Sequence, residues 1–295
     1  MKRKNVISNL FAFIIGVMLL HNADARAVNI LKSAGWLESA YMEWQPVDGA
    51  VSYNVYYEKT GGDKVKIDDK LIRKYPGYMR ADAMGIAAGE YSLTMEALDD
   101  KGNTIDTGTA NSLVVAPNVR EGFAFTGGNI PGAYKFDGTP KDGAHIIYVT
   151  DTDINSVVCD VKDKKGKATS YTGLGDILAA YSKGYDKTPL IIRVVGTLTD
   201  TNFAGIKDGN YLNLLGGNNS DRSLENVTVE GVGNDATLYG FGITMKRTLN
   251  VEIRNLGIML FGDDAVSLDT DNRHIWIHNI DFLYGKHGKD ADQVK

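Results

Sequence analysis

Paired carboxylates near the C-terminal end of the sequence are the side chains whose type and spacing best suit chemistry. They form three pairs: Asp263 with Asp264, Asp269 with Asp271, and Asp290 with Asp292. Carboxylate oxygens that converge on one face can hold calcium, which takes about six to eight oxygen ligands. Aspartates in polar loops also serve as solvated turn residues, and we expect only that role for Asp269 and Asp271. The other two pairs are candidate calcium ligands.

A repeat of 24 residues predicts the scaffold that would position these carboxylates. The segments NVTVEGV, NVEIRNL and HIWIHNI begin at Asn226, Asn250 and His274, and each has apolar residues at its second, fourth and seventh positions. A fixed period of this size indicates stacked supersecondary units. The β-branched residues favour a β-solenoid over a leucine-rich repeat. We therefore predict a right-handed parallel β-helix, on which side chains of successive rungs align on one external face.

Other segments fit the same stack. PLIIRVVGTL (189–198) is expected to form an earlier strand. Apolar residues at helical spacing predict a helix over 174–183, with Thr172 as its N-cap, that caps the open end of the first rung. Gly231, Asn255 and Asn279 share one phase of the repeat, where amide side chains can form ladders, so we expect a structural role for Asn279.

The preceding residues, 28–116, show a different pattern of short strands and turns. Alternating apolar residues, such as Tyr91, Leu93, Met95 and Ala97, predict an antiparallel β-sandwich. Trp44, the segment VSYNVYYEK and Tyr91 lie where a fibronectin type III module has its core tryptophan, central strand and tyrosine corner, and the segment resembles that family. The aperiodic stretch VVAPNVREG (114–122) marks the boundary to a second domain at 120–295.

The N-terminus predicts export. A basic start, an apolar run from Leu10 to Leu20 and the small residues of Ala23-Asp24-Ala25 form a signal peptide over residues 1–25. The run is shorter than the ~20 residues of a spanning helix, so we expect a secreted protein, extracellular or periplasmic, without a membrane anchor. The single cysteine, Cys159, lies among valines and is expected to be a small buried hydrophobe.

The charge balance restricts the partners. The formal net charge is −5, and the segment 1–25 contains three basic residues but one acidic residue, so the remaining chain is more acidic still. This argues against nucleic acid as a partner. An acidic polymer would need a divalent cation to bridge the like charges.

Five segments of residues 120–295 resemble, in order, motifs of the pectate lyase family. They are TPLIIRVVGTL, ENVTVEGVGNDATLYGFGITM, LNVEIRNLGIM, DDAVSLD and HIWIHNIDF. The resemblance implies a calcium-dependent lyase that cleaves polygalacturonate or pectin, an acidic plant polysaccharide, by β-elimination.

The resemblance also implies roles for individual residues. Asp264 matches the aspartate that opens the family's D-A-I-S calcium site, Asp263 is its neighbour, and Asp290 and Asp292 approach the same site. The family's W-I-D-H lacks its aspartate here, so His278 has no role from the resemblance and is equally suited to a groove or a turn. The arginine expected as base lies beyond Lys295. We therefore expect residues 26–295 alone to be inactive and poorly soluble, because the last rung exposes a strand edge and apolar core.

Two alternatives remain. Gly262-Asp263-Asp264 followed by His287-Gly288 loosely resembles motifs of polygalacturonases, in which the carboxylates would act as general acid and base of a hydrolysis. A non-catalytic polysaccharide-binding β-helix is the other alternative. Lyase activity yields an unsaturated product that absorbs ultraviolet light, hydrolysis yields reducing ends alone, and a binding module yields neither.

Overall fold

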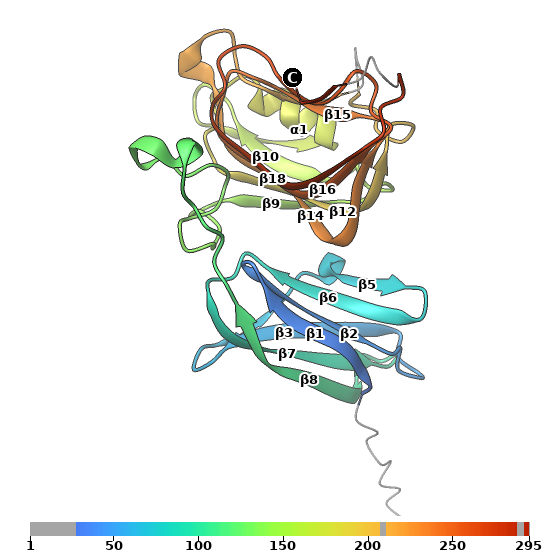
Figure 1. Ribbon diagram of the computed structural model, residues 1–295. Coiled ribbons are helices and arrows are strands. Elements are labelled where there is room, and N and C mark those ends of the chain that lie inside the picture. Colours follow the sequence, from blue (N-terminus) through green and yellow to red (C-terminus); the bar gives the residue numbers. More distant parts are fainter. Residues whose placement is uncertain (1–27, 207–210, 288–291, 295) are drawn as a thin grey trace, which may run out of the picture.

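The computed structural model describes residues 28–206, 211–287 and 292–294 (Figure 1). The fold is all-β: two antiparallel sheets come first along the chain, and two parallel sheets follow. Residues 1–25, predicted as a signal peptide, and Asp290 lie outside the described residues. In the described part of the chain, none of the helices combines the length and the apolar character that crossing a membrane requires.

The first half is a β-sandwich. One sheet has the order β1-β2-β6-β5, with β1 at Ile30–Trp36, β2 at Ser39–Trp44, β6 at Tyr78–Met84 and β5 at Ile72–Tyr75. The other has the order β4-β3-β7-β8, with β4 at Lys64–Lys66, β3 at Ser52–Lys59, β7 at Gly89–Leu98 and β8 at Thr104–Val115. Short 3-10 turns lie at Asp69–Leu71, Phe123–Gly128 and Ser220–Arg222.

The core of the sandwich follows the alternation in the sequence. Tyr91, Leu93, Met95 and Ala97 of β7 are all buried, and Trp44 of β2 is fully buried as expected. The hydroxyl of Tyr91 donates a hydrogen bond to the Ala87 carbonyl oxygen at 2.8 Å, the geometry of a tyrosine corner. The two sheets therefore share one apolar core.

The second half is the start of a parallel β-helix, as predicted. Its larger sheet has the order β18-β16-β14-β12-β9, with β9 at His145–Val149, β12 at Leu190–Thr199, β14 at Leu224–Tyr239, β16 at Thr248–Met259 and β18 at Arg273–Leu283. Its second sheet has the order β13-β15-β17-β19, with β13 at Tyr211–Leu215, β15 at Gly242–Lys246, β17 at Asp264–Leu268 and β19 at Asp292–Val294.

The 24-residue repeat corresponds to one rung. Val227 of β14 pairs with Val251 of β16, which pairs with Ile275 of β18. Since the step and the register agree, residues at one position of the repeat stack directly on one another. The predicted earlier strand is also confirmed, because β12 pairs in parallel with both β9 and β14.

The turns of the rungs use residues in the left-handed region. Asn226, Asn250 and His274 have φ between 56° and 58°, and Asn255 and Asn279 have φ of 55° and 54°. The Asn279 amide donates to the side-chain oxygen of Asn255 at 3.1 Å, and the Asn255 amide donates to the Gly231 carbonyl at 2.8 Å. The predicted amide ladder, and the structural role of Asn279, are confirmed.

The first rung is covered by a short helix and a hairpin. Helix α1 spans Leu174–Tyr181, and the hairpin pairs β10 (Val158–Lys162) with β11 (Ala168–Thr172). The apolar side of α1 packs into the β-helix core. The predicted N-cap was wrong: Gly173, at φ 89°, is the cap residue, because Thr172 still belongs to β11. Cys159 of β10 is buried in the same core as expected, and burial raises the pKa of its thiol to about 11.

The parallel sheet β9–β18 faces the sandwich. In Figure 1 it lies between α1 on one side and strands β5 and β6 on the other. Val232 of β14 belongs to the core of the sandwich, and Tyr148 and Val195 pack against that core.

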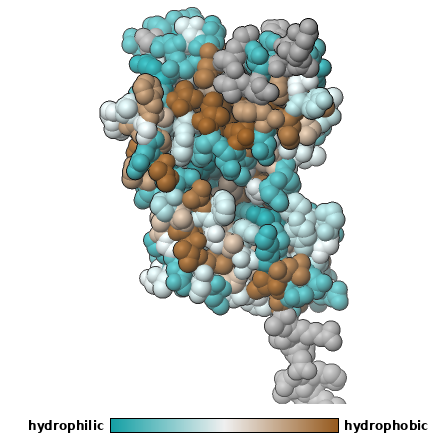
Figure 2. Space-filling view, in the orientation of Figure 1, coloured by the Kyte–Doolittle hydropathy of each residue, from teal (hydrophilic) through white to brown (hydrophobic). Residues whose placement is uncertain are grey.

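In Figure 2, hydrophobic residues gather on the side of the β-helix half that is turned to the viewer. On β18, Ile275 and Ile277 are half-buried and pack on the β-helix core.

Candidate functional site

Asp264 begins strand β17 and is almost completely buried, with 3 % of its surface exposed. Its Oδ2 lies 3.1 Å from the Tyr211 hydroxyl, and its backbone N–H donates to the same hydroxyl at 2.9 Å. Its Oδ1 is buried and has no hydrogen-bond partner among the described residues. A buried carboxylate oxygen without a partner is costly, so this oxygen is suited to a ligand.

The sequence did not indicate Tyr211 as part of this site. Tyr211 lies on β13, and between β13 and β17 runs β15, in which Gly242 pairs with Tyr211. A Cβ on Gly242 would lie 2.1 Å from the Asp264 carbonyl oxygen, so only glycine fits there. Burial, above all, raises the pKa of Tyr211 to about 12, which keeps its hydroxyl protonated at neutral pH.

The other predicted ligands are placed differently. Asp263 is exposed, and its carbonyl oxygen accepts a hydrogen bond from the Asp292 N–H at 3.0 Å. Asp292 pairs with Asp264 in the register of β17 and β19, and its side chain is exposed. Asp290 lies outside the described residues.

The predicted oxygen ligands of calcium are thus brought together only in part. Asp264 and Asp292 lie on adjacent strands at one corner of the second sheet, and Asp263 directly precedes β17. Within the described ranges, however, no three side chains of His, Cys, Asp or Glu lie close enough together to hold a metal.

Asp269 and Asp271 show the solvated role expected of them. Asp269 forms an ion pair with Lys246 at 2.6 Å, and its carboxylate accepts hydrogen bonds from the backbone and hydroxyl of Thr270. Asp271 lies 3.4 Å from Arg273. Both carboxylates serve local turn structure.

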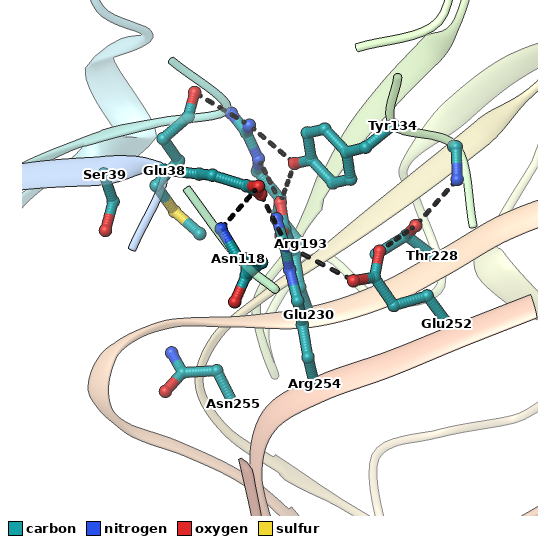
Figure 3. A network of polar contacts seen from close by, with 12 residues as sticks. Glu38, Ser39, Asn118, Tyr134, Arg193, Thr228, Glu230, Glu252, Arg254 and Asn255 are labelled. Carbon is teal, nitrogen blue, oxygen red and sulfur yellow. Dashed lines mark hydrogen bonds and ion pairs between the residues drawn. The ribbon is translucent and has the colours of Figure 1, made fainter. Parts of the chain in front are cut away.

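A second concentration of polar groups lies between the two halves of the molecule (Figure 3). Successive rungs align five residues at one position of the sheet: Tyr148, Arg193, Glu230, Arg254 and His278. Because neighbouring side chains of a strand point to opposite faces, this row faces the sandwich and the apolar residues on either side face the β-helix core. Arg193 Nε and Arg254 Nε each lie 2.9 Å from a carboxylate oxygen of Glu230.

The sandwich contributes Glu38 to this network. Glu38 lies in the turn between β1 and β2, with φ 51°, and is 1 % exposed. Its carboxylate contacts Arg254 at 3.1 Å and Arg120 at 2.9 Å. Burial opposes its ionisation, but the Arg120 hydrogen bond and the charges of Arg254 and Arg120 outweigh burial and lower its pKa to about 2. Glu38 thus links the two halves as a buried anion.

His278 belongs to this interface. Its ring stacks on Trp276, with ring centroids 3.6 Å apart, and its Nε2 lies 3.1 Å from a carboxylate oxygen of Glu252. Of the two roles left open for His278, the turn is wrong, because His278 lies inside β18; its side chain instead lines a groove between the two halves. A sequence signal for the network existed: the fifth residue of each repeat copy is polar, as Glu230, Arg254 and His278.

Comparisons with known proteins add a distant relationship. No known family profile matches the sequence. Two pectate trisaccharide-lyases of Bacillus licheniformis are each 31 % identical over 118 residues, which is 39 % of this chain and 31 % of the relative. Part of this chain is distantly similar to pectate lyases. The match spans about a third of the length of those relatives.

Solved structures give weaker matches. An exopolygalacturonase of Yersinia enterocolitica aligns with 88 % of this chain and 70 % of its own, at 13 % identity and a TM-score of 0.22. A pectate lyase of Pectobacterium carotovorum aligns with 91 % and 89 %, at 11 % identity and a TM-score of 0.19. A β-1,2-glucanase of Parabacteroides distasonis covers 32 % of this chain and 14 % of its own, at 17 % identity and a TM-score of 0.24. TM-scores this low do not establish a shared fold.

Proposed function

We propose that the β-helix belongs to a secreted, calcium-dependent polysaccharide lyase that cleaves polygalacturonate by β-elimination. The observation that carries this proposal is the 31 % identity to pectate trisaccharide-lyases. The β-helix, whose rungs repeat every 24 residues, supports it as a scaffold that presents side chains in rows. The fibronectin type III-like sandwich and the signal peptide at 1–25 are parts of the same proposal.

The chemistry of the substrate explains what such a site must provide. The C5 proton of a uronate is adjacent to a carboxylate and is only weakly acidic. Its removal needs a base, together with positive charge or hydrogen-bond donors that stabilise the enolate-like transition state. Among the described residues, Asp264 supplies a ligand oxygen and no base is proposed.

The calcium requirement rests on two features. The Oδ1 of Asp264 is buried without a partner among the described residues, and Asp292 is in register with it on the neighbouring strand. The remaining oxygen ligands have to come from groups other than these. Calcium also accounts for the way in which an acidic protein could hold an acidic polymer.

A thermal-shift titration tests the metal directly. We expect calcium to raise the unfolding midpoint of the protein, since a ligand that binds the folded state stabilises it. Asp264→Asn should abolish most of that shift, whereas Asp269→Asn, which alters an exposed ion pair, should leave it unchanged. Equal shifts in the wild type and Asp264→Asn would count against a calcium site at Asp264.

An activity assay tests the reaction. With polygalacturonate as substrate, a protein that carries this chain should yield an ultraviolet-absorbing product that disappears with a chelator. Reducing ends without that absorbance would indicate hydrolysis and refute the lyase.

The structure gives the hydrolase alternative little support. A general acid or base must reach solvent and substrate, whereas Asp264 is 3 % exposed and bound to Tyr211. Asp263 is exposed, and so is His287, but Gly288 lies outside the described residues. The lyase proposal uses Asp264 as a buried ligand, which its position allows.

A further inference from the structure

A cleft of about 460 Å³ opens where the first hairpin of the sandwich meets the turns of the β-helix. Lys32, Trp36 and Tyr41 line it from β1 and β2, and Asn234 and Asn279 line it from β14 and β18. Asp264, on the other parallel sheet, is not among the described residues that line the cleft. Clefts between domains are common positions for ligand sites.

The charge accessible in this cleft is positive. Three carboxylates reach its wall, those of Glu38, Asp82 and Glu230, but each is at most 5 % exposed and forms ion pairs with arginines. Lys32 is exposed, and none of the described carboxylates lies within ion-pair distance of it. An anionic group that enters the cleft therefore meets the Lys32 ammonium, which lies 5.6 Å from the centroid of the Tyr41 ring; the cross-strand neighbour Glu43 pairs with Arg80 instead.

The cleft also offers an aromatic surface. Trp36 is 65 % exposed, and its ring stacks on no other ring in the described part of the chain. The neighbouring Tyr41 ring already carries the Arg80 guanidinium, 4.0 Å from its centroid. An exposed indole beside a polar cleft is suited to stacking against the apolar face of a sugar ring, because it combines a large apolar area with little loss of entropy.

Two asparagine side chains also line the cleft. Asn234 and Asn279 are exposed, and Asn234 makes no side-chain hydrogen bond among the described residues. The Asn279 amide nitrogen is held by Asn255, which leaves its oxygen to accept a hydrogen bond from a ligand. Sugar hydroxyl groups both donate and accept hydrogen bonds, so they can pair with the donor and acceptor groups of amide side chains.

The floor of the cleft is rigid. Glu38 joins Arg254 of the β-helix to Arg120, and Arg254 also binds Glu230. Since these buried ion pairs fix the two halves relative to each other, the cleft is formed before a ligand arrives. A pre-formed site loses less free energy on binding.

We propose that this cleft binds a short acidic oligosaccharide, with Trp36 stacked on a sugar ring and Lys32 paired with its carboxylate. The uronate identity of the sugar rests on the proposed function, whereas the acidic sugar class rests on the cleft itself. The site would hold the polymer away from the Asp264 corner, as an accessory subsite.

Calorimetric titration of the protein with a short oligogalacturonate tests the site. We expect Trp36→Ala and Lys32→Gln each to weaken binding about tenfold. Phe136→Ala and Lys101→Gln are matched controls, since Phe136 is also 65 % exposed, Lys101 is exposed, and neither residue lines the cleft. The controls should bind as the wild type does.

The outcomes separate this site from the proposed function. Binding that depends on Trp36 and Lys32 but not on a chelator or on Asp264→Asn supports the cleft, whether or not lyase activity is found. Binding that is lost in Asp264→Asn but unchanged in Trp36→Ala would refute the proposed binding site in the cleft and leave the lyase proposal unaffected. A neutral galacto-oligosaccharide that binds equally well would overturn the acidic class, and absence of any binding would overturn the site.

Discussion

At Asp264 one tyrosine hydroxyl serves two polar groups of the same residue. The Tyr211 oxygen accepts the Asp264 N–H and lies within hydrogen-bond distance of Oδ2. Asp264 is almost completely buried and the contact is partly buried, so water has only limited access to replace Tyr211. The hydroxyl therefore supports the start of β17 as well as the orientation of the carboxylate.

Tyr211→Phe tests this dependence. We expect a loss of about 1–3 kcal/mol in the free energy of unfolding, since two buried polar groups lose their partner. Urea unfolding followed by circular dichroism measures the change. Tyr239→Phe is a suitable control, because Tyr239 is 38 % exposed and its hydroxyl has no hydrogen-bond partner among the described residues. Equal stability of the two variants would refute the role of Tyr211.

At the scale of the elements, the rungs depend on residues that turn the chain between strands. Asn255 combines two requirements: a backbone at φ 55°, and a side-chain amide that donates to the carbonyls of Gly231 and Gly233 at 2.8 and 3.0 Å. Glycine would meet the first requirement and alanine neither, so the two substitutions separate backbone strain from hydrogen bonding.

We therefore expect Asn255→Ala to be less stable than Asn255→Gly by about 1 kcal/mol. Asn255→Gly should in turn be less stable than the wild type by about 1–2 kcal/mol, because the two carbonyls lose their donor. Chemical unfolding of the three proteins gives both differences. Equal stability of the Ala and Gly variants would show that the left-handed backbone imposes no strain here.

At the scale of the whole molecule, Glu38 joins the two halves through buried charges. Removal of one partner from a buried ion pair is strongly destabilising, because the remaining charges stay buried without compensation. Glu38→Gln keeps the shape but leaves Arg120 and Arg254 without this anion. We expect a loss of about 3 kcal/mol in unfolding free energy.

Proteolysis at the connection between the halves and chemical unfolding would both report that loss. The control is Glu58→Gln on β3, where the carboxylate is exposed and has no ion pair within the described residues. That variant should differ from the wild type by less than about 0.5 kcal/mol. If Glu38→Gln behaved in the same way, the network would not hold the interface.

The lowered pKa of Glu38 also predicts a pH dependence. Its pKa is about 2 in the folded protein and 4.5 as the ordinary value, so the folded state favours the ionised form. This contribution is complete above pH 4.5 and is lost as the pH falls towards 2. Unfolding free energies measured across this range should decline less steeply in Glu38→Gln than in the wild type. Parallel declines would contradict the assignment.

Local patterns in the sequence were sufficient for much of the fold. The period that joins Asn226, Asn250 and His274 fixes the rung length, and alternating apolar residues fix which face of each strand is buried. These features involve spacings of a few residues up to one rung. They can be recognised without knowing which distant segments meet.

The contacts that define the sites were decided by the tertiary structure. Tyr211 and Asp264 are 53 residues apart, and Glu38 and Arg254 are 216 apart. No local pattern specifies such pairs, since each side chain is an ordinary polar residue in its own segment. Stacking of the rungs places Tyr211 and Asp264 on strands to either side of the one that contains Gly242. Docking of the sandwich buries the charged side chains that the repeat aligns on one face. The sequence by itself determined the rows of side chains, and only the packing of one half on the other decided which row became an interface.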